Sequence, residues 1–561
     1  MSCRETILSD STYDFIVAED ESNPIRIAPV CIQKIDDEYS IYYYENAALP
    51  PLSIEDYSYT AIPKCFVPID STSLEVSGIL ALQNQPALSL KGKGIIVGIV
   101  DTGIDYTNPL FLGEDNSSRI LRIWDQTDNT GESPEGFLYG TEYDKEEIDR
   151  ALTLVNPLDA VPVMDASGHG TFLASVAAGG VDVDSDFTGA VPLAELVVVK
   201  LKQAKRYVRE FFYYPQEELL YQENDVMAGV AYLESIAQKE NKPLVLFIGL
   251  GSNQGSHTGS GPLSRVLSRI GGQQKRCVVV GAGNEAIARH HFYGNAIDSL
   301  APVRAEINVE EGIEGFCMEL WAFAPELVRV VVQSPTGQQS QGRFPLSQET
   351  LNTRFVFEDT TLSINYRAPG RESKDLLIFF RFTKPAAGIW TILIYPQITI
   401  TGAFHIWLPM KIDALAGDVT FVRPNPDTTI TIPADANVPI SVGGYEALTG
   451  ARYIESGRGF DARGDIKPDF CAPAVMVSGA GLRGNYVTYT GTSVAAAISA
   501  GACAQALEWG ILKGNAPTMN SVEVKNLLIR GCNREDNLSY PNTEWGFGRL
   551  NIYQSFQNLR E

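Results

Sequence analysis

A serine at the start of a run of small residues is the first feature of this sequence that could do chemistry. Ser493 follows Gly491-Thr492 and precedes Val494-Ala495-Ala496-Ala497, whose small side chains favour a helix that packs closely against other elements. Backbone N–H groups and the positive end of the helix dipole would then surround the hydroxyl. That position suits a nucleophile whose reaction places negative charge on a neighbouring oxygen. Alone, the run is more typical of helix packing than of chemistry.

Three further polar residues could assist this hydroxyl. Asp101 follows an apolar run, where it either caps a turn or holds an imidazole in one tautomer. His169, one of five histidines, stands between glycines, as a surface residue or as a general base. Asn284 follows another apolar run, as a turn residue or as an amide donor to an oxyanion. A histidine can take a serine's proton near neutral pH, and a carboxylate behind it stabilises the resulting imidazolium.

The order of these residues, with the flanks Asp-Thr-Gly, Gly-His-Gly-Thr and Gly-Thr-Ser, resembles the subtilisin-type serine peptidases, or subtilases. This resemblance implies that Ser493 is the nucleophile and His169 its general base. It implies that Asp101 orients His169 and that Asn284 helps to form the oxyanion hole. The expected activity is hydrolysis of peptide bonds in protein or peptide substrates.

The resemblance covers about residues 75–285 and 430–561, and it extends to substrate binding. Gly249-Leu250-Gly251 is similar to the family's Ser-Leu-Gly segment, with glycine in place of serine. This segment is expected to bind an extended peptide as an added strand. The nucleophile motif also departs from the family's Met-Ala-Ala-Pro continuation, since Val494 and Ala497 replace methionine and proline. Neither position carries chemistry, so an active enzyme is expected.

Continuous apolar runs indicate the fold of these two stretches. They lie at residues 94–100, 196–199, 244–248 and 278–280. Such runs are typical of parallel strands covered on both faces. Helical candidates alternate with them, which predicts an α/β, doubly wound parallel-sheet domain over residues 71–294 and 426–561. Functional sites in such sheets gather at the carboxyl ends of the strands.

Two other segments have a different composition. Residues 1–70 are polar and acidic with short strand-like pieces, which predicts a small α+β N-terminal module. Residues 295–425 contain short strand-like stretches separated by turns rich in proline and glycine, which predicts an inserted β-sandwich or jelly roll. Two roles are open for this insertion: a rigid clamp that braces the catalytic domain, or a surface that binds a partner or a glycan.

This domain arrangement, together with the segment Ser71–Ile79 and the following Gln83-Asn84-Gln85-Pro86, resembles the clostridial germination-type Csp subtilases. The resemblance implies that residues 1–70 are a prodomain that is cut once, between about Cys65 and Ser73, and then stays bound as an intramolecular inhibitor. Val67–Pro68 is a poor candidate for the cut because the proline ring obstructs the leaving amide.

The same resemblance implies a substrate class, a spore cortex hydrolase precursor. Some members of that family have lost triad residues, so the alternative is a catalytically silent regulatory or binding protein on a subtilase scaffold, a pseudoprotease. Retention of Asp101, His169 and Ser493 favours the enzyme.

Composition bounds the partners and the location. The net charge of −24 argues against nucleic acid or anionic membranes, and the absence of a long apolar run predicts no membrane span. The N-terminus lacks the pattern of a secretory signal peptide, so a cytoplasmic or spore-associated location is expected.

Eight scattered cysteines are expected to be reduced, mostly buried thiols. No cofactor is expected. The acidic run at residues 182–186 lacks metal-loop spacing, so no metal is expected.

Overall fold

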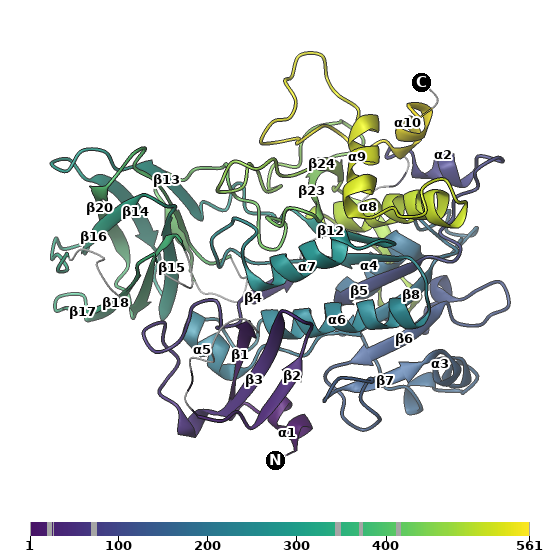
Figure 1. The fold of residues 1–561 in the computed structure, drawn as a ribbon, viewed down its shortest axis with the longest axis horizontal. Helices are drawn as coiled ribbons and strands as arrows, with labels where there is room; N and C mark the ends of the chain where they lie inside the picture. Colours follow the sequence, from purple (N-terminus) through teal and green to yellow (C-terminus); the bar gives the residue numbers. More distant parts are fainter. Residues whose placement is uncertain are drawn as a thin grey trace.

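The computed structural model describes residues 2–18, 25, 27–68, 74, 76–342, 349–369, 374–410 and 417–559, with the backbone alone for 66–68 and 349. In the view of Figure 1, an α/β domain lies on the right. The N-terminal module lies below its left edge, and a domain of strands alone projects to the left.

An eight-stranded sheet is the centre of the α/β domain. Its strand order is β24-β23-β12-β10-β5-β8-β6-β7, and neighbouring strands are parallel except for the edge strand β7. The strands are β5 (Ile96–Asp101), β6 (Ile120–Asp125), β7 (Thr141–Asp144), β8 (Glu195–Lys200), β10 (Leu244–Ile248), β12 (Arg276–Gly281), β23 (Ile440–Tyr445) and β24 (Phe470–Pro473). The four apolar runs of the sequence form β5, β8, β10 and β12, which confirms the parallel-sheet prediction.

Helices cover both faces of this sheet. They are α2 (Ile79–Gln83), α3 (Lys145–Leu152), α4 (His169–Ala178), α6 (Glu223–Lys239), α7 (Pro262–Gly272), α8 (Thr492–Leu507), α9 (Ser521–Gly531) and α10 (Ile552–Gln557). Helix α5 (Arg206–Phe212) packs instead with the N-terminal module and the domain of strands. Side chains of a strand alternate between faces. Val97 and Ile99 of β5 therefore pack with α4 and α8 in one core, whereas Ile96 and Val100 pack with α6 in a second core. The α4 and α8 helices share the face that carries the site described below.

The insertion consists of two antiparallel sheets around one core. The six-stranded sheet has the order β13-β21-β15-β19-β18-β17, and the four-stranded sheet has the order β16-β20-β14-β22. The strands are β13 (His291–Asn295), β14 (Val303–Val309), β15 (Gly315–Ala322), β16 (Leu327–Gln333), β17 (Glu349–Phe355), β18 (Thr360–Arg367), β19 (Leu376–Thr383), β20 (Gly388–Ile398), β21 (Ala403–Trp407) and β22 (Val419–Phe421). We refer to residues 291–421 as the β-domain.

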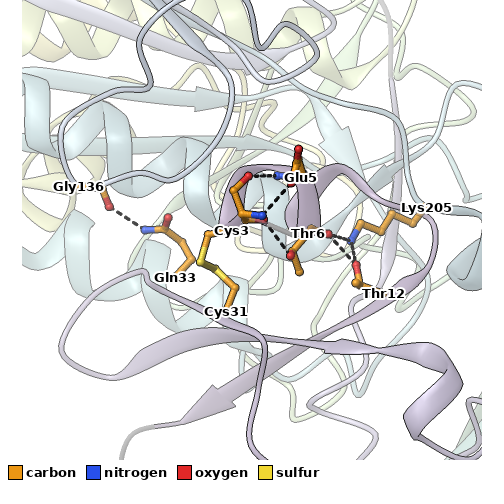
Figure 2. Close-up of a disulfide and its surroundings, with 9 residues drawn as sticks. Cys3, Glu5, Thr6, Thr12, Cys31, Gln33, Gly136 and Lys205 are labelled. Atoms are coloured by element: carbon orange, nitrogen blue, oxygen red, sulfur yellow. Dashed lines mark hydrogen bonds between the residues drawn. A yellow bond between two sulfur atoms is a disulfide. The ribbon is translucent and has the colours of Figure 1, made fainter.

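The N-terminal module joins helix α1 (Cys3–Leu8) to a three-stranded antiparallel sheet. The sheet has the order β1-β3-β2, from β1 (Thr12–Ala18), β2 (Cys31–Lys34) and β3 (Tyr39–Glu45). A disulfide between Cys3 and Cys31 ties α1 to β2 (Figure 2). The expectation that all cysteines are reduced is therefore wrong for this pair, whose Cα atoms the fold brings to 5.3 Å across 28 residues of chain. The other six cysteines are free and buried.

A buried ion pair attaches the module to the α/β domain. The Lys205 Nζ atom lies 2.6 Å from Asp14 Oδ1 and also donates a hydrogen bond to Thr12 Oγ1 at 2.8 Å (Figure 2 shows the Thr12 contact). The second oxygen of Asp14 accepts hydrogen bonds from Gln222 and Asn224, each at 3.3 Å. Because both charged side chains are almost completely buried, removal of either one leaves an uncompensated charge in the interface.

We expect Asp14→Ala to lower the free energy of unfolding by about 3–5 kcal/mol, because it leaves the buried Lys205 ammonium without its carboxylate partner. Urea unfolding followed by tryptophan fluorescence measures this loss. The double variant Asp14→Leu/Lys205→Met removes both charges and should be more stable than Asp14→Ala. Equal stability of Asp14→Ala and the wild type would contradict the importance of the pair.

Candidate active site

Asp101 and His169 meet at the carboxyl edge of the sheet. Asp101 is the last residue of β5, His169 is the first residue of α4, and the distance from Asp101 Oδ1 to His169 Nδ1 is 2.6 Å. The Thr102 N–H also donates to Asp101 Oδ1, at 2.7 Å. A carboxylate that accepts the Nδ1 proton leaves Nε2 as the nitrogen that can take up a proton. This pair is therefore built to act as a general base.

Asp165 fixes the start of the helix that carries His169. Its Oδ1 accepts hydrogen bonds from Thr102 Oγ1 (2.8 Å) and the Gly168 N–H (2.9 Å), and its Oδ2 accepts the Thr171 N–H (2.8 Å). A Cβ atom on Gly170 would clash with the carbonyl oxygen of Gly103, so α4 packs directly on the loop after Asp101. The role of Asp165 was not predicted from the sequence. Its position before a glycine-flanked helix start, where acidic residues serve as caps, was the available signal.

Gly249 lies between Ser493 and Asp101. A Cβ built on Gly249, the residue after β10, would lie 3.1 Å from Ser493 Cβ and 3.5 Å from Asp101 Oδ2. Both predicted residues are therefore within van der Waals range of one point. The same Cβ would lie 2.8 Å from Leu173 Cδ1, which explains why glycine stands where the family pattern has serine. Among the described residues, none forms a hydrogen bond with the buried Ser493 hydroxyl.

Asn284 is tied to the residue before Ser493. Its Oδ1 accepts a hydrogen bond from the Thr492 N–H at 3.1 Å, and the neighbouring Gly283 N–H donates to Thr492 Oγ1 at 2.9 Å. With its oxygen turned to Thr492, the amide presents its NH₂ group on the opposite side. The Ser493 N–H belongs to the first turn of α8, where backbone donors have no partner within the helix. Two hydrogen-bond donors are thus available beside the hydroxyl.

A strand of the chain itself lies along the predicted substrate-binding segment. Strand β4 (Cys65–Pro68) pairs with β11 (Leu250–Gly251) on one side and with β9 (Tyr221–Gln222) on the other, both antiparallel. Pro68 faces Leu250 and Val67 faces Gly251. The predicted segment therefore holds an extended peptide, which is the tail of the N-terminal module. Figure 1 shows β4 behind α7. The predicted window for a cut, 65–73, begins in β4, and its residues 69–73 lie outside the described part of the chain.

A buried ion pair supports the loop of Asn284. Glu285 Oε2 lies 2.7 Å from His290 Nδ1 and accepts a hydrogen bond from Asn253 Nδ2, also at 2.7 Å. Burial alone would lower the pKa of His290, but the charge of Glu285 and hydrogen bonds to Asp418 and Glu285 outweigh it and raise the pKa to about 9. His290 is therefore an imidazolium at neutral pH, and it directly precedes strand β13 of the β-domain.

The helix that carries Ser493 also bears on membrane insertion. By length and composition, the helix Thr492–Leu512 could cross a membrane, a candidate that the sequence prediction did not include. However, 89% of its most apolar stretch is buried inside the protein. Its small apolar residues pack against the sheet and α4.

No group of three or more histidine, cysteine or acidic side chains among the described residues is arranged to hold a metal ion.

The raised pKa of His290 predicts a pH-dependent contribution to stability. Its stabilisation is complete below the unfolded pKa of about 6.5 and is lost as the pH rises through about 9. The difference corresponds to about 3 kcal/mol. Melting temperatures of wild type and His290→Gln should therefore differ most near pH 6 and converge near pH 10. A difference that is constant with pH would contradict the ion pair.

Comparisons with known proteins agree with this geometry. The model of the Subtilase family matches residues 92–303 and 416–548. The structure of the CspB protease of Clostridium perfringens is similar, with 29% identity and a TM-score of 0.77, over 87% of this chain and 97% of that one. A subtilisin-like protease of Arabidopsis thaliana, SBT2.2, is 34% identical over 107 residues, which span 18% of this chain and 12% of that protein. The chain belongs to the subtilase family of serine endopeptidases.

Proposed function

We propose that the protein hydrolyses peptide bonds through a triad of Ser493, His169 and Asp101. The observation that carries the proposal is the 2.6 Å contact between Asp101 and His169 at the edge where Gly249 adjoins both Asp101 and Ser493. A binding protein has no need for a buried carboxylate behind an imidazole beside a serine at a helix start.

In the proposed reaction, the Ser493 Oγ forms a bond to the carbonyl carbon of the substrate while His169 Nε2 takes the hydroxyl proton. Asp101 holds the imidazole and stabilises its protonated form. The amide of Asn284 and the Ser493 N–H donate to the oxyanion. The C–N bond then breaks as His169 returns the proton to the leaving amine. Water, activated by His169, hydrolyses the acyl-enzyme and regenerates the Ser493 hydroxyl.

We further propose that residues 1–69 are a prodomain that the enzyme cuts and keeps. Support comes from β4, which pairs with Leu250 and Gly251 as a substrate strand would. Pro68 pairs with Leu250, which directly follows Gly249, the neighbour of Ser493, so we expect the cut shortly after Pro68. The bond Ile69–Asp70, within the window of 65–73, is therefore the proposed cleavage site. The tail that remains in the cleft makes the prodomain an intramolecular inhibitor.

Intact mass of the purified chain tests self-cleavage. We expect wild type to give two fragments, the first ending at Ile69, and Ser493→Ala to give one uncut chain. Ser499→Ala is the matched control, because Ser499 is another buried serine of α8 whose hydroxyl only bonds the Ala495 carbonyl, at 2.7 Å, and it should be cut like wild type. One uncut species in wild type would remove self-processing from the proposal.

Removal of the Asn284 amide tests the oxyanion hole. We expect Asn284→Ala to slow self-cleavage after refolding from urea by about 10²–10³-fold, because one fixed donor to the oxyanion is lost. The time course of the two fragments on a gel gives the rate constant, and the melting temperature shows whether the fold is retained. A rate within about threefold of wild type in a folded variant would exclude this role.

The alternative, a catalytically silent regulatory protein, makes a different prediction for a fluorophosphonate probe. An active serine reacts covalently, whereas a silent one does not. Labelling should be present in wild type, stronger in Asp14→Ala, whose module is less firmly attached, and absent in Ser493→Ala. No labelling in either of the first two proteins favours the pseudoprotease.

The most specific part of the proposal is the substrate class. The resemblance to the Csp subtilases supports a spore cortex hydrolase precursor as the substrate, in the cytoplasm or in the spore. Incubation of the processed enzyme with such a precursor, followed by mass spectrometry, tests it. A specific cut that Ser493→Ala does not make supports this assignment, and an unchanged precursor rejects it.

A further inference from the structure

The substrate cleft continues beyond β9 and β11 to residues 64 and 65 of the tail. The Cys65 N–H donates a hydrogen bond to Gln254 Oε1 at 2.9 Å. The Glu223 N–H donates to the Lys64 carbonyl at 2.8 Å, and the Lys64 N–H donates to Glu223 Oε2 at 3.3 Å. Glu223 and Gln254 belong to the α/β domain. This domain therefore binds the backbone at Cys65, which also pairs with Gln222 of β9, and at Lys64, one residue beyond the strand pairs.

The Lys64 side chain enters a buried acidic position. Its Nζ lies 3.8 Å from Glu223 Oε2, and the two side chains are only 6% and 3% exposed. The ammonium also donates to the carbonyl oxygens of Tyr59 and Ile62, both at 2.7 Å, which belong to the module. Glu223 is held from the other side, where its Oε1 accepts the Leu263 N–H at 3.2 Å. The carboxylate therefore keeps this contact when the tail leaves, but it loses the Lys64 ammonium.

A cavity and the side-chain NH₂ group of Gln254 lie beside the Lys64–Glu223 pair. A cavity of about 370 Å³ is lined by Lys64, Glu223 and Gln254, and its wall also carries the cationic side chains of Arg265, Lys374 and Arg463. Gln254 is only 4% exposed, and no described residue accepts a hydrogen bond from its Nε2. This donor needs an acceptor, which lysine and arginine side chains lack, so it is the volume of the cavity, and not this donor, that can receive a basic side chain. A longer side chain than the tail supplies would fit here.

We propose that Glu223 and Gln254 form an outer subsite that selects substrates with lysine or arginine where the tail carries Lys64. This position is three residues before the one that faces Gly251 and, in the sequence, the sixth before the proposed cleaved bond. The inference rests on the proposed peptidase function. A basic side chain restores the charge partner of a carboxylate that is costly to leave unpaired, whereas an acidic side chain meets repulsion.

Peptide substrates test this selection. Fluorogenic peptides with the sequence of residues 62–73 carry lysine, arginine, methionine or glutamate at the position of Lys64, and the self-processed full chain is the enzyme. We expect kcat/KM for lysine and arginine to exceed that for methionine by at least about tenfold, with glutamate lowest. In Glu223→Gln the ratio of lysine to methionine should fall to about one. Glu240→Gln, which removes the same charge at the residue that follows α6, should keep the wild-type ratio.

Equal cleavage of the lysine and methionine peptides by wild type would overturn the subsite while leaving the peptidase intact. The same ratio in wild type and Glu223→Gln would assign the preference to other residues and would also overturn it.

A second measurement does not depend on catalysis. In the Ser493→Ala background, melting temperatures of Lys64→Met, Glu223→Gln and the double variant form a cycle. We expect the double variant to lose less than the two single losses combined, because the charges interact. Additive losses would overturn the pairing of Glu223 with a cation. Coupled losses without cleavage of any peptide or of the chain itself would support the site and refute the proposed peptidase.

Discussion

The parallel arrangement of three neighbouring strands is the constraint on which the site depends. β10 lies between β5 and β12, and all three end at the same edge of the sheet. Asp101 ends β5, Gly249 follows β10 and Asn284 lies in the loop after β12. Residues more than 180 positions apart in the chain therefore become neighbours. The close approach of Gly249 to Ser493 and Asp101 leaves no room for a Cβ atom without movement of Leu173. Any change in the register of β10 would therefore move the hydroxyl, the carboxylate and the substrate segment together.

The β-domain meets the cleft and the module through hydrogen bonds, aromatic stacking and a shared buried apolar cluster. Glu319 of β15 accepts hydrogen bonds from the Gly255 N–H, at 2.9 Å, and from the Tyr59 hydroxyl. Trp407 of β21 stacks on His257 of the loop after β11, with ring centroids 4.1 Å apart. These contacts favour the role of a clamp over that of a free binding surface, because they brace the loop that carries Gln254. The ion pair of His290 with Glu285 adds a third contact, behind Asn284.

The sequence predicts the parts of this structure that have long, uniform patterns. The fully apolar runs became the central strands, and the motifs around Asp101, His169 and Ser493 marked the ends that carry the site. The cleft strands were not predictable, since β9 and β11 have two residues each and show no periodicity. Glu223 and Gln254 were missed for a related reason. Their partners Lys64 and Cys65 are 159 and 189 positions away, and nothing in a local pattern indicates such a contact. The pairing of Cys3 with Cys31 likewise depends on how α1 docks on the module's sheet.

Two of the contacts that attach the module to the enzyme have different consequences. The ion pair of Asp14 with Lys205 lies outside the cleft, whereas Lys64 and β4 lie inside it. A cut after Ile69 would break neither attachment. The tail would then compete with substrate as a tethered peptide, whose effective concentration far exceeds that of a free inhibitor. The Asp14 contact reaches the cleft strand β9 only through the side chain of Gln222, whereas the tail pairs with the backbones of β9 and β11. The tail can therefore leave the cleft while the module stays bound. A substrate that replaces Lys64 with its own basic side chain would compensate Glu223 at the moment the tail is displaced. The same buried carboxylate would thus hold the inhibitor in place and select the substrate that displaces it.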